Sequence, residues 1–327
     1  MIETGRGVLV LTQSFDPHAD LVISELDRMG AQNWRVDTSD FPLNMTFSAL
    51  NRQNGWDAWL EWSGCDLNLA EVGTIWFRRP TRFKVNPALE GSQREFALGE
   101  CRMAMGGVLR ALPARWVNHP EAIVSADYKP YQLATASRLG FEVPASLVTN
   151  DPAKARDFVR NVGRAIYKPL SAVVVGADED RPLVQFTRDV DVHNEEALDA
   201  VGQAPCLFQE RVEKAHDLRV VVIGRHLFAV EIHARGDETS LDWRRNYDEL
   251  SYAPHSPAPE LRDLCLLLVH ELRLVFGVID LAVRPDGTVL FFEINTNGQW
   301  AWLEEAIPEM AMVRTMARFL VGRSADP

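Results

Sequence analysis

The sequence is poor in cysteine, in basic charge and in long apolar runs, and each shortage excludes a class of protein. Four of the 327 residues are cysteines, and no two of them lie close enough in sequence to form a CxxC pair. A chain of this length with so few cysteines is not built on a disulfide framework, so we expect reduced thiols. No apolar run reaches the roughly 18 residues that a membrane-spanning helix needs.

Basic residues are outnumbered by acidic ones. The chain has 34 Lys and Arg against 46 Asp and Glu, a formal net charge of −12. Proteins that bind nucleic-acid phosphates are normally basic, so we expect no nucleic acid as a partner, and no membrane either. The first charged residue at the N-terminus is acidic (MIETGRG), and the only apolar run there is short, Val8–Leu11. Because a signal peptide needs a basic start and a longer apolar stretch, we expect a cytoplasmic protein.

The chain begins with a predicted strand, a helix and a second strand. Residues 7–13 are apolar enough for a buried strand, residues 16–30 have apolar side chains at helical spacing, and residues 31–38 predict the next strand. This order favours a parallel sheet, and we expect a Rossmann-like domain over residues 1–120. No GxGxxG motif follows the first strand, so nothing supports a dinucleotide site there.

The pattern of the remaining residues predicts two further domains, residues 121–204 and residues 205–327. Its periodicity indicates a hairpin across residues 171–187 and helices over residues 259–276 and 301–321. No internal repeat and no low-complexity segment is present.

A turn in the last domain places two carboxylates opposite each other. The segment GVIDLAV-RPDG-TVLFFEIN has Pro, Asp and Gly between two apolar runs. We expect residues 285–288 to form the turn, so that Arg284 pairs with Val289. Asp280 then faces Glu293 across the hairpin. The apolar pairs in this register are Ile279 with Ile294 and Leu281 with Phe292.

Asn295 lies on the same strand face as Glu293, two residues further on. Opposed positions have Cβ atoms about 4.5–5.5 Å apart, and two carboxylates that close repel each other unless a cation or a proton lies between them. Two carboxylates and a carboxamide are oxygen ligands that suit Mg²⁺, and the hairpin has no histidine for zinc. The alternative is a solvated strand edge with unrelated acids, and the hairpin alone does not decide between the two.

Three further elements precede the hairpin in a fixed order. A lone lysine in a strand (IYKPL), a QExV segment (LFQERV) and a DxR segment (DLR) come before the D…ExN hairpin. Over roughly residues 115–310 this order resembles the ATP-grasp superfamily. The stretches IWFRRP and FEINTNGQWAWLEEA are similar to those of the microviridin and graspetide macrocyclases, which are ATP-grasp maturases of ribosomal peptides. The resemblance implies an α/β fold in which two α+β subdomains sandwich ATP, preceded by the Rossmann-like domain.

The resemblance also implies roles for individual residues. Those expected to bind ATP are Lys129 and Lys168 for the phosphates, the backbone of Glu210, Arg211, Val212 and Glu213 for adenine, and Asp217 for the ribose hydroxyls. Those expected to stabilise charge during transfer are Arg219 and Arg244. Those expected to bind two Mg²⁺ ions are Asp280, Glu293 and Asn295, with Glu293 between the ions.

Several of these residues have ordinary alternatives. Lys129 also fits a helix-surface lysine, and Asp217 fits a turn residue. Arg245 is next to Arg244 and can exchange roles with it. The glycine-rich loop that many ATP-grasp enzymes place over the phosphates is reduced here to one glycine, Gly176.

The implied function is that of an ATP-grasp ligase. It phosphorylates Asp or Glu side chains of a ribosomal precursor peptide, made of leader and core, and forms ω-ester links to Thr or Ser, or ω-amide links to Lys. A RimK-like ligase that adds an amino acid to a carboxylate shares the ATP site and stays an alternative, as does a non-catalytic nucleotide-binding module. The resemblance to these enzymes also implies a dimer, so a homodimer is a further expectation.

Overall fold

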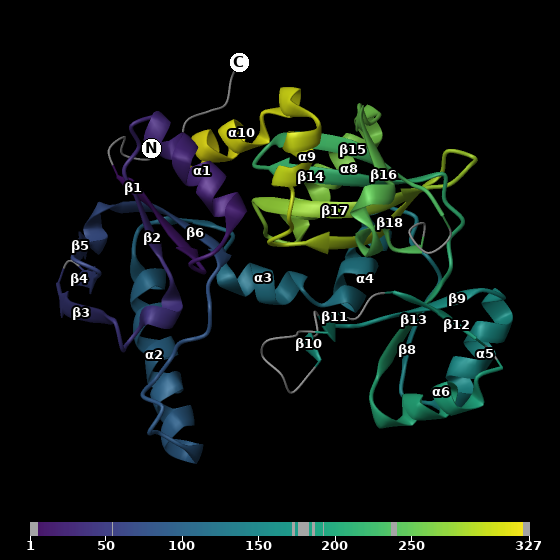
Figure 1. Ribbon diagram of the computed structural model, residues 1–327, viewed down its shortest axis with the longest axis horizontal. Helices are drawn as coiled ribbons and strands as arrows, with labels where there is room; N and C mark the ends of the chain where they lie inside the picture. The colour runs from purple at the N-terminus through teal and green to yellow at the C-terminus, as the bar shows by residue number, and fades with distance from the viewer. Residues whose placement is uncertain are drawn as a thin grey trace. The chain divides into compact units, whose positions relative to one another are not determined.

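The computed structural model describes residues 6–53, 55–171, 174–175, 183–184, 187–191, 193–236 and 241–322, with the backbone alone for 174–175 and 183–184. The chain divides into two compact units, and Figure 1 labels the elements of both. One unit is made of Met1–Pro120 and Ala311–Pro327, and the other of Glu121–Met310.

The first unit is built on a parallel sheet. Its strand order is β2 (Asn33–Val36), β1 (Gly7–Thr12), β6 (Val72–Arg79) and β7 (Arg115–Val117). Strand β1 is buried along its whole length, as expected for an apolar strand inside a parallel sheet. The main helices of this unit are α1 (Pro17–Arg28), α2 (Gly91–Ala111) and α10 (Met312–Leu320), and α1 packs against α10. The parallel α/β start that the sequence predicts is confirmed.

A second, antiparallel sheet in this unit is not predicted by the sequence. It consists of β3 (Met45–Arg52), β4 (Gly55–Trp62) and β5 (Cys65–Asn68). Few of its side chains are buried, and Leu60 and Leu67 are among those that reach the core. The alternation of apolar and polar residues that predicts a strand is therefore weak in this part of the sequence.

The single helix predicted over residues 301–321 is wrong. Pro308 has no N–H with which to continue a helix, so α9 (Ala301–Ala306) stops before it. A short 3₁₀ turn, η6 (Pro308–Met310), and Ala311 in the left-handed region, with φ 49°, separate α9 from α10.

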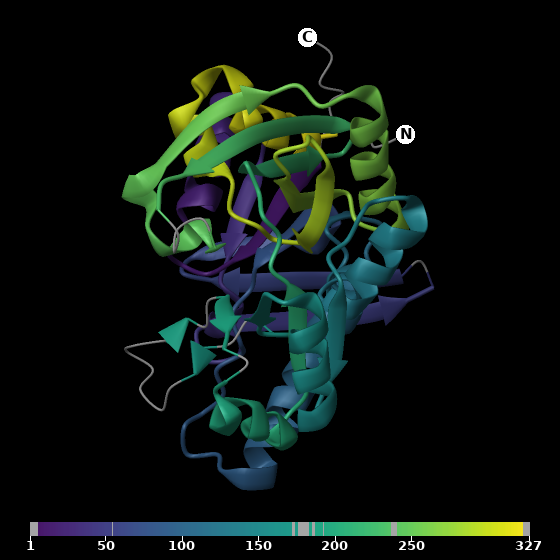
Figure 2. The ribbon, with the colours of Figure 1, turned by 90° about the vertical axis from the view of Figure 1, so that its right-hand side faces the viewer.

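The second unit contains a five-stranded antiparallel sheet. Its strand order is β16 (Leu250–His255), β15 (His226–Ala234), β14 (His216–Ile223), β17 (Phe276–Val283) and β18 (Val289–Asn295). Helices α4 (Lys129–Leu139) and α8 (Pro259–Glu271) cover one face, where Leu218, Val220 and Val222 enter the hydrophobic core. Figures 1 and 2 show both helices beside these strands. The intervening residues of β14 point to the opposite face.

A four-stranded antiparallel sheet precedes it in the chain. Its strand order is β12 (Arg188–Val190), β9 (Ala165–Lys168), β13 (Cys206–Glu210) and β8 (Ser146–Thr149), with helices α5 (Pro152–Val162) and α6 (Glu195–Asp199). The hairpin predicted across residues 171–187 is present as β10 (Val174–Val175) paired with β11 (Leu183–Val184). Gly176 lies outside the described residues.

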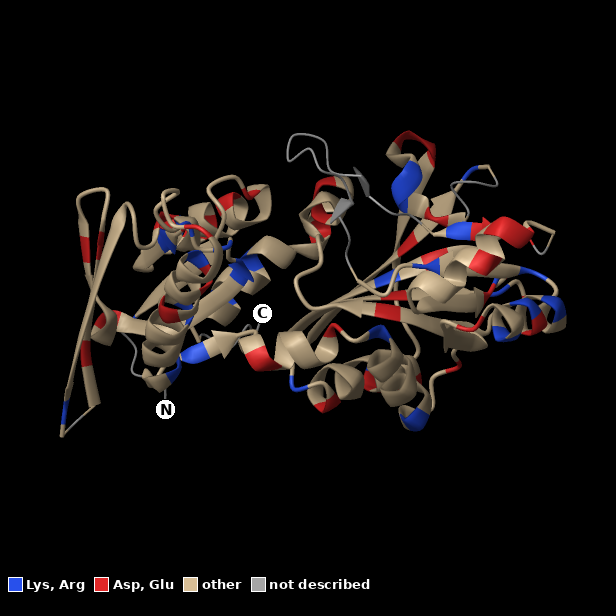
Figure 3. Ribbon diagram, turned by 90° about the horizontal axis from the view of Figure 1, so that it is seen from below, with Lys and Arg blue, Asp and Glu red and all other residues tan. Residues whose placement is uncertain are grey.

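Charged residues occur throughout both units. Figure 3 shows Lys and Arg interspersed with Asp and Glu along their helices and strands. Among the helices in the described ranges, none has the length and apolarity to cross a membrane.

The predicted C-terminal hairpin is present as β17 and β18, with an error in its register. The pairs that agree with the prediction are Asp280 with Glu293 and Ile279 with Ile294. The pairs that are wrong are Arg284 with Val289 and Leu281 with Phe292. A β-bulge after Asp280 causes the difference, because Leu281 pairs with Phe291. Phe291 is fully buried in the core, whereas Phe292 is only partly buried.

Candidate active site

Arg219 and Asp280 meet on the polar face of the five-stranded sheet. They are cross-strand neighbours on β14 and β17, and Nη1 of Arg219 lies 2.5 Å from Oδ1 of Asp280. Nη2 donates a second hydrogen bond of 2.7 Å to the backbone carbonyl of Gln299. The two side chains are only 6% and 15% exposed, so buried partners hold the guanidinium in one position.

Glu293 faces Asp280 and is surrounded by cations. Nζ of Lys129, the first residue of α4, lies 2.5 Å from Oε2 of Glu293, and Nη1 of Arg244 lies 3.7 Å from Oε1. Burial raises the pKa of Glu293, but the charges of Lys129, Arg244 and Lys168 outweigh burial and hold that pKa well below its usual range. Glu293 is therefore ionised at neutral pH.

Asp280 is the harder of the two carboxyls to ionise. Burial raises the pKa of Asp280, Arg219 opposes this effect, and the charge of Glu293 adds to it. Nδ2 of Asn295 donates a hydrogen bond of 3.1 Å to Oδ2 of Asp280. The two carboxylates and the amide form an oxygen donor set that fits Mg²⁺, and a cation there relieves the repulsion between the carboxylates.

Arg244 and Arg245 point in different directions. Arg244 forms a two-point ion pair with the buried Asp242, with Nε and Nη2 at 2.8 and 2.9 Å from its carboxylate oxygens. Arg245 donates to the backbone carbonyl of Thr187 at 2.6 Å. Since Arg244 also approaches Glu293, it is the arginine of the two that lies at the carboxylate pair.

Lys168 ends strand β9 and lies against an aromatic ring. Its Nζ is 4.5 Å from the ring centroid of Phe292, the residue that the bulge keeps out of the core. Burial lowers the pKa of Lys168 to about 8, with the charge of Glu293 opposing the shift. An anion bound at this nitrogen stabilises its charged form.

Asp217 lies on the same strand face as Arg219 and is paired with Lys214. Nζ of Lys214 lies 2.6 and 2.7 Å from the two oxygens of Asp217. Burial raises the pKa of Asp217, and Lys214 opposes the shift. Asp217 is thus a buried strand residue and not a turn residue.

Known proteins show which sequences and folds this chain resembles. The sequence model of the MvdD pre-ATP grasp domain matches residues 7–124. The fold is similar to that of a Chryseobacterium gregarium RiPP-associated ATP-grasp ligase in complex with ADP and a leader and core peptide, with a TM-score of 0.88, 27% identity and 97% of each chain covered. A search of curated protein sequences found no match.

Two macrocyclases of Microcystis aeruginosa MRC are also similar. MdnC, bound with the precursor peptide MdnA, has a TM-score of 0.84 and 27% identity over 96% of this chain and 99% of its own. MdnB has a TM-score of 0.80 and 28% identity over 97% of this chain and 99% of its own. The chain has the fold of the RiPP-associated ATP-grasp ligases, and its residues 7–124 match the MvdD pre-ATP grasp domain. The predicted ATP-grasp fold with its N-terminal domain is confirmed, and the roles of single residues in this ligase stay predictions.

The predicted adenine segment of the ligase, Glu210–Glu213, begins at the last residue of β13. Its first two N–H groups bond the backbone carbonyls of Ala145 and Arg164. A base that binds this segment as an acceptor therefore has to use the N–H of Val212 or Glu213.

The GQWAW stretch of the ligase, residues 298–302, packs around Arg219. The ring of Trp302 lies 5.5 Å from that of Trp243, and the guanidinium of Arg219 lies 5.1 Å from the Trp243 ring and 5.9 Å from the Trp302 ring. Trp300 is fully buried. The stretch supports the arginine by packing and by the Gln299 carbonyl.

The IWFRRP stretch of the ligase lies on β6 in the first unit. Trp76 and Arg78 are both 1% exposed. Nε of Arg78 lies 3.4 Å from Oδ2 of Asp16, the N-cap residue of α1. These two side chains belong to the interior of that unit.

Sequence reasoning missed Lys214, Asp242 and Phe292. Lys214 and Asp242 stand near predicted residues in the sequence, so proximity to Asp217 and Arg244 is the signal that identifies them. The bulge places Phe292 outside the core, where it reaches Lys168. The only trace of this bulge in the hydrophobic pattern is the pair of consecutive phenylalanines.

Proposed function

We propose that this ligase cross-links a ribosomal precursor peptide with the energy of ATP. It phosphorylates an Asp or Glu side chain of the peptide and joins that carboxyl to a Thr or Ser hydroxyl as an ω-ester, or to a Lys amine as an ω-amide. The observation that carries the proposal is the opposed pair Asp280 and Glu293, each with a cation of its own, on the polar face of an ATP-grasp sheet. Similar structures hold ADP with a leader and core peptide, or the precursor peptide MdnA, which supports a peptide substrate.

The residues at this face fit ATP. Lys129 and Lys168 supply two positive charges for the phosphates, and a bound phosphate would stabilise the charged form of Lys168 against the effect of burial. The carboxylate of Asp217 can accept hydrogen bonds from the ribose hydroxyls, and the charge of Lys214 opposes the rise that burial causes in its pKa. The Glu210–Glu213 backbone lies at the end of the adjoining sheet, where we place adenine.

Asp280, Glu293 and Asn295 would hold Mg²⁺, because this ion prefers hard oxygen ligands. When bound, Mg²⁺ neutralises charge on the phosphate oxygens during transfer. In the structure Lys129 and Arg219 form ion pairs with two of these ligands. We infer that the Lys129 side chain turns to the phosphates when ATP binds, whereas Arg219 keeps its place beside Asp280, and that the ligand set would hold two ions.

The reaction consists of two displacements. A carboxylate oxygen of the peptide attacks the γ-phosphorus, the bond between that phosphorus and the ADP oxygen breaks, and an acyl phosphate forms. A hydroxyl or amine of the same peptide then attacks the acyl carbon and loses its proton, and inorganic phosphate leaves. Arg219 and Arg244 are each fixed by a carboxylate and stabilise the charge that develops on the transferring oxygens.

Mass spectrometry of a precursor peptide tests this function. The ligase is incubated with ATP, Mg²⁺ and a candidate precursor encoded beside its gene, and a sample without ATP is the control. Loss of one water mass per ring, with one ADP released for each, supports cross-linking. Mild alkaline hydrolysis restores the mass of an ester product but not that of an amide.

Two other results point to the alternatives. Gain of one residue mass, when a free amino acid is supplied, supports the RimK-like ligase. Tight ATP binding with an unchanged peptide and no ADP supports a binding module. The expected homodimer stays a prediction, and sedimentation velocity measures it.

A further inference from the structure

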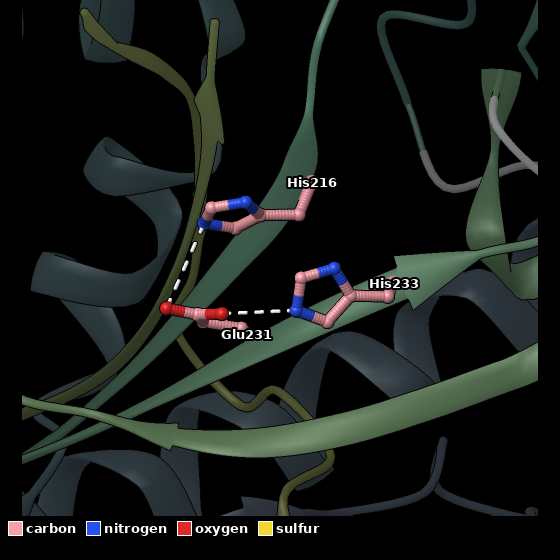
Figure 4. A group of neighbouring side chains, drawn as sticks. All are labelled: His216, Glu231 and His233. Atoms are coloured by element: carbon pink, nitrogen blue, oxygen red, sulfur yellow. Dashed lines mark hydrogen bonds and ion pairs between the residues drawn. The ribbon is translucent and has the colours of Figure 1, made fainter. Parts of the chain in front are cut away.

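A group of polar side chains lies on the face of the five-stranded sheet opposite the candidate active site. His216 begins β14, and Glu231 and His233 stand two apart on the neighbouring strand β15. Glu231 pairs with Leu218, which lies in the core on the face that α4 and α8 cover, whereas Asp217 alternates to the other face. Figure 4 shows both imidazole rings turned towards the Glu231 carboxylate.

The candidate ligand atoms of this group are close together. Nε2 of His233 lies 2.9 Å from Oε2 of Glu231, and Nε2 of His216 lies 3.9 Å from Oε1. One ligand atom from each of the three residues lies within 4.8 Å of the other two. Tetrahedral zinc with bonds of about 2.0–2.2 Å has ligand atoms about 3.4 Å apart, so side-chain movements of about an ångström close the site.

Nε2 of His216 is buried and has no hydrogen-bond partner among the residues that the structure describes. A buried polar atom without a partner is destabilising, and such atoms often mark the place of an ion. A cation shared with Glu231 removes this defect.

His255 holds the carboxylate of this group from a third strand. Its Nδ1 lies 2.8 Å from Oε1 of Glu231. Hydrogen bonds of this kind orient the carboxylate ligands of metal sites. The side chain of His233 is 43% exposed, so an ion and a water molecule can enter from that side.

We propose that His216, Glu231 and His233 bind one Zn²⁺ or a similar divalent transition metal. His255 orients the carboxylate, and water takes the fourth position. Two imidazoles and one carboxylate select such a metal over Mg²⁺, for which the all-oxygen set of the active site is suited. The ion connects β14 to β15 directly behind Asp217 and stabilises the sheet. This site is independent of the proposed reaction.

Zinc binding by the full chain, purified without a histidine tag, tests the proposal. Competition with a chromogenic chelator, in buffer that contains Mg²⁺ to occupy the active-site carboxylates, measures stoichiometry and affinity. We expect one Zn²⁺ per chain, and at least about tenfold weaker binding for His216→Ala and for His233→Ala. His226→Ala, at the other end of β15, is the matched control and should bind like the wild type. No zinc binding by the wild type, or equal affinity in all variants, overturns the proposal.

Two further measurements keep the test decisive if an alanine variant folds poorly. Zn²⁺ should raise the unfolding temperature of the wild type but not that of His233→Gln, which replaces a partly exposed side chain with a polar one. An equal rise in both proteins contradicts the site. The Co²⁺-loaded protein should show no thiolate charge-transfer band, and such a band would assign the metal to a cysteine instead.

Discussion

Gln132 of α4 hydrogen-bonds both backbone groups of Ile294, the residue between Glu293 and Asn295. Its Nε2 donates to the carbonyl at 2.9 Å, and its Oε1 accepts from the N–H at 3.0 Å. Strand β18 is the edge of its sheet, so within the described part of the chain these outward groups have no neighbouring strand to bond. One buried side-chain amide therefore takes the place of a strand and fixes two predicted metal ligands.

We predict that Gln132→Leu lowers kcat by roughly 10- to 100-fold, because a displacement of about an ångström at Glu293 and Asn295 is enough for such a loss. The unpaired backbone groups of Ile294 should also lower the free energy of unfolding by about 1–3 kcal/mol. Peptide cross-linking kinetics and thermal unfolding measure the two effects. Tyr131→Phe, on the exposed side of the same helix, should change neither. A wild-type kcat in Gln132→Leu would contradict the positioning role.

Glu293→Gln removes the charge that lies between Lys129 and Arg244. We predict a loss of at least about 100-fold in kcat/KM, since a metal site supplies several kcal/mol of transition-state stabilisation. The circular dichroism spectrum should be unchanged, because Gln keeps the shape of Glu. Glu305→Gln, exposed on α9, is the control and should keep full activity. Full activity of Glu293→Gln would remove this residue from the metal site.

The sequence predicts the hairpin at the centre of the site from its turn residues and its apolar face. The predicted register is wrong by one residue next to the turn, and the bulge after Asp280 offsets this error, so that Asp280 still pairs with Glu293. Lys129 follows only from family resemblance, since nothing in its helix distinguishes it from a surface lysine. The structure places it against Glu293 with 24% of its side chain exposed.

Other parts of the site depend on contacts that no local pattern encodes. Gln132 and Ile294 are 162 positions apart in sequence. Phe292 reaches Lys168 only because of a bulge, and a bulge reverses the alternation from which strand faces are predicted. Nothing in the sequence distinguishes Lys214 from other charged residues, and the turn before β14 places it beside Asp217.

ATP binding should depend on pH through Lys168. Its pKa in the free protein is about 8 because of burial, and a bound phosphate favours the charged form. Affinity for ATP should therefore be constant below about pH 8 and fall by up to tenfold per pH unit above it. Isothermal titration calorimetry on both sides of that pH measures the change.

Two variants of Lys168 isolate its contribution to this profile. Lys168→Met should bind ATP weakly and lose this component of the pH dependence. Lys168→Arg stays charged and should extend the plateau to higher pH. An unchanged profile in Lys168→Met would assign the titration to another group.

Gly298 allows the chain to pass closely over β17. A Cβ at this position would lie 2.6 Å from Cβ of Val278 and 3.1 Å from Cβ of Asn295, and neither atom can move without its backbone. We predict that Gly298→Ala lowers the free energy of unfolding by about 1–3 kcal/mol through overpacking. It should also reduce kcat, because the next residue, Gln299, holds Arg219 through its carbonyl. Thermal unfolding and cross-linking kinetics measure both.

Gly107→Ala on α2 is the matched control for this substitution. A Cβ at Gly107 meets nothing within 4 Å, and the residue lies inside a helix. Alanine there should stabilise the protein by about 0.5–1 kcal/mol. Similar effects of the two substitutions would show that close approach at Gly298 is not the cause.

Asp16 and Arg78 form a buried ion pair in the first unit. Their side chains are 2% and 1% exposed, and Nε of Arg78 lies 3.4 Å from Oδ2 of Asp16. Asp16 also accepts hydrogen bonds from the N–H groups of His18 and Ala19 at the start of α1 and from the Thr12 hydroxyl. One carboxylate thus compensates a buried charge and caps a helix.

We predict that Asp16→Asn lowers the local stability of this unit by about 3–5 kcal/mol at neutral pH, because it removes the negative charge that lies beside the buried guanidinium of Arg78. Burial raises the pKa of Asp16, but Arg78 and the Thr12 hydrogen bond outweigh it, so the pKa lies below the ordinary 3.8. A carboxyl with a lowered pKa contributes its full stability above the unfolded-state pKa and loses it as the pH falls through the folded-state pKa. The difference between wild type and variant should therefore vanish in acid.

Hydrogen exchange of the α1 amides in the full chain, at neutral and at acid pH, measures this difference. Asp20→Asn is the matched control on the same helix: Asp20 is 51% exposed and pairs with Arg35, so its loss should cost no more than about 1 kcal/mol. If exchange in Asp16→Asn differs from the wild type by the same amount at every pH, the effect comes from the shape of the cap. If the difference disappears as Asp16 becomes protonated, the charge of the pair is what stabilises the unit.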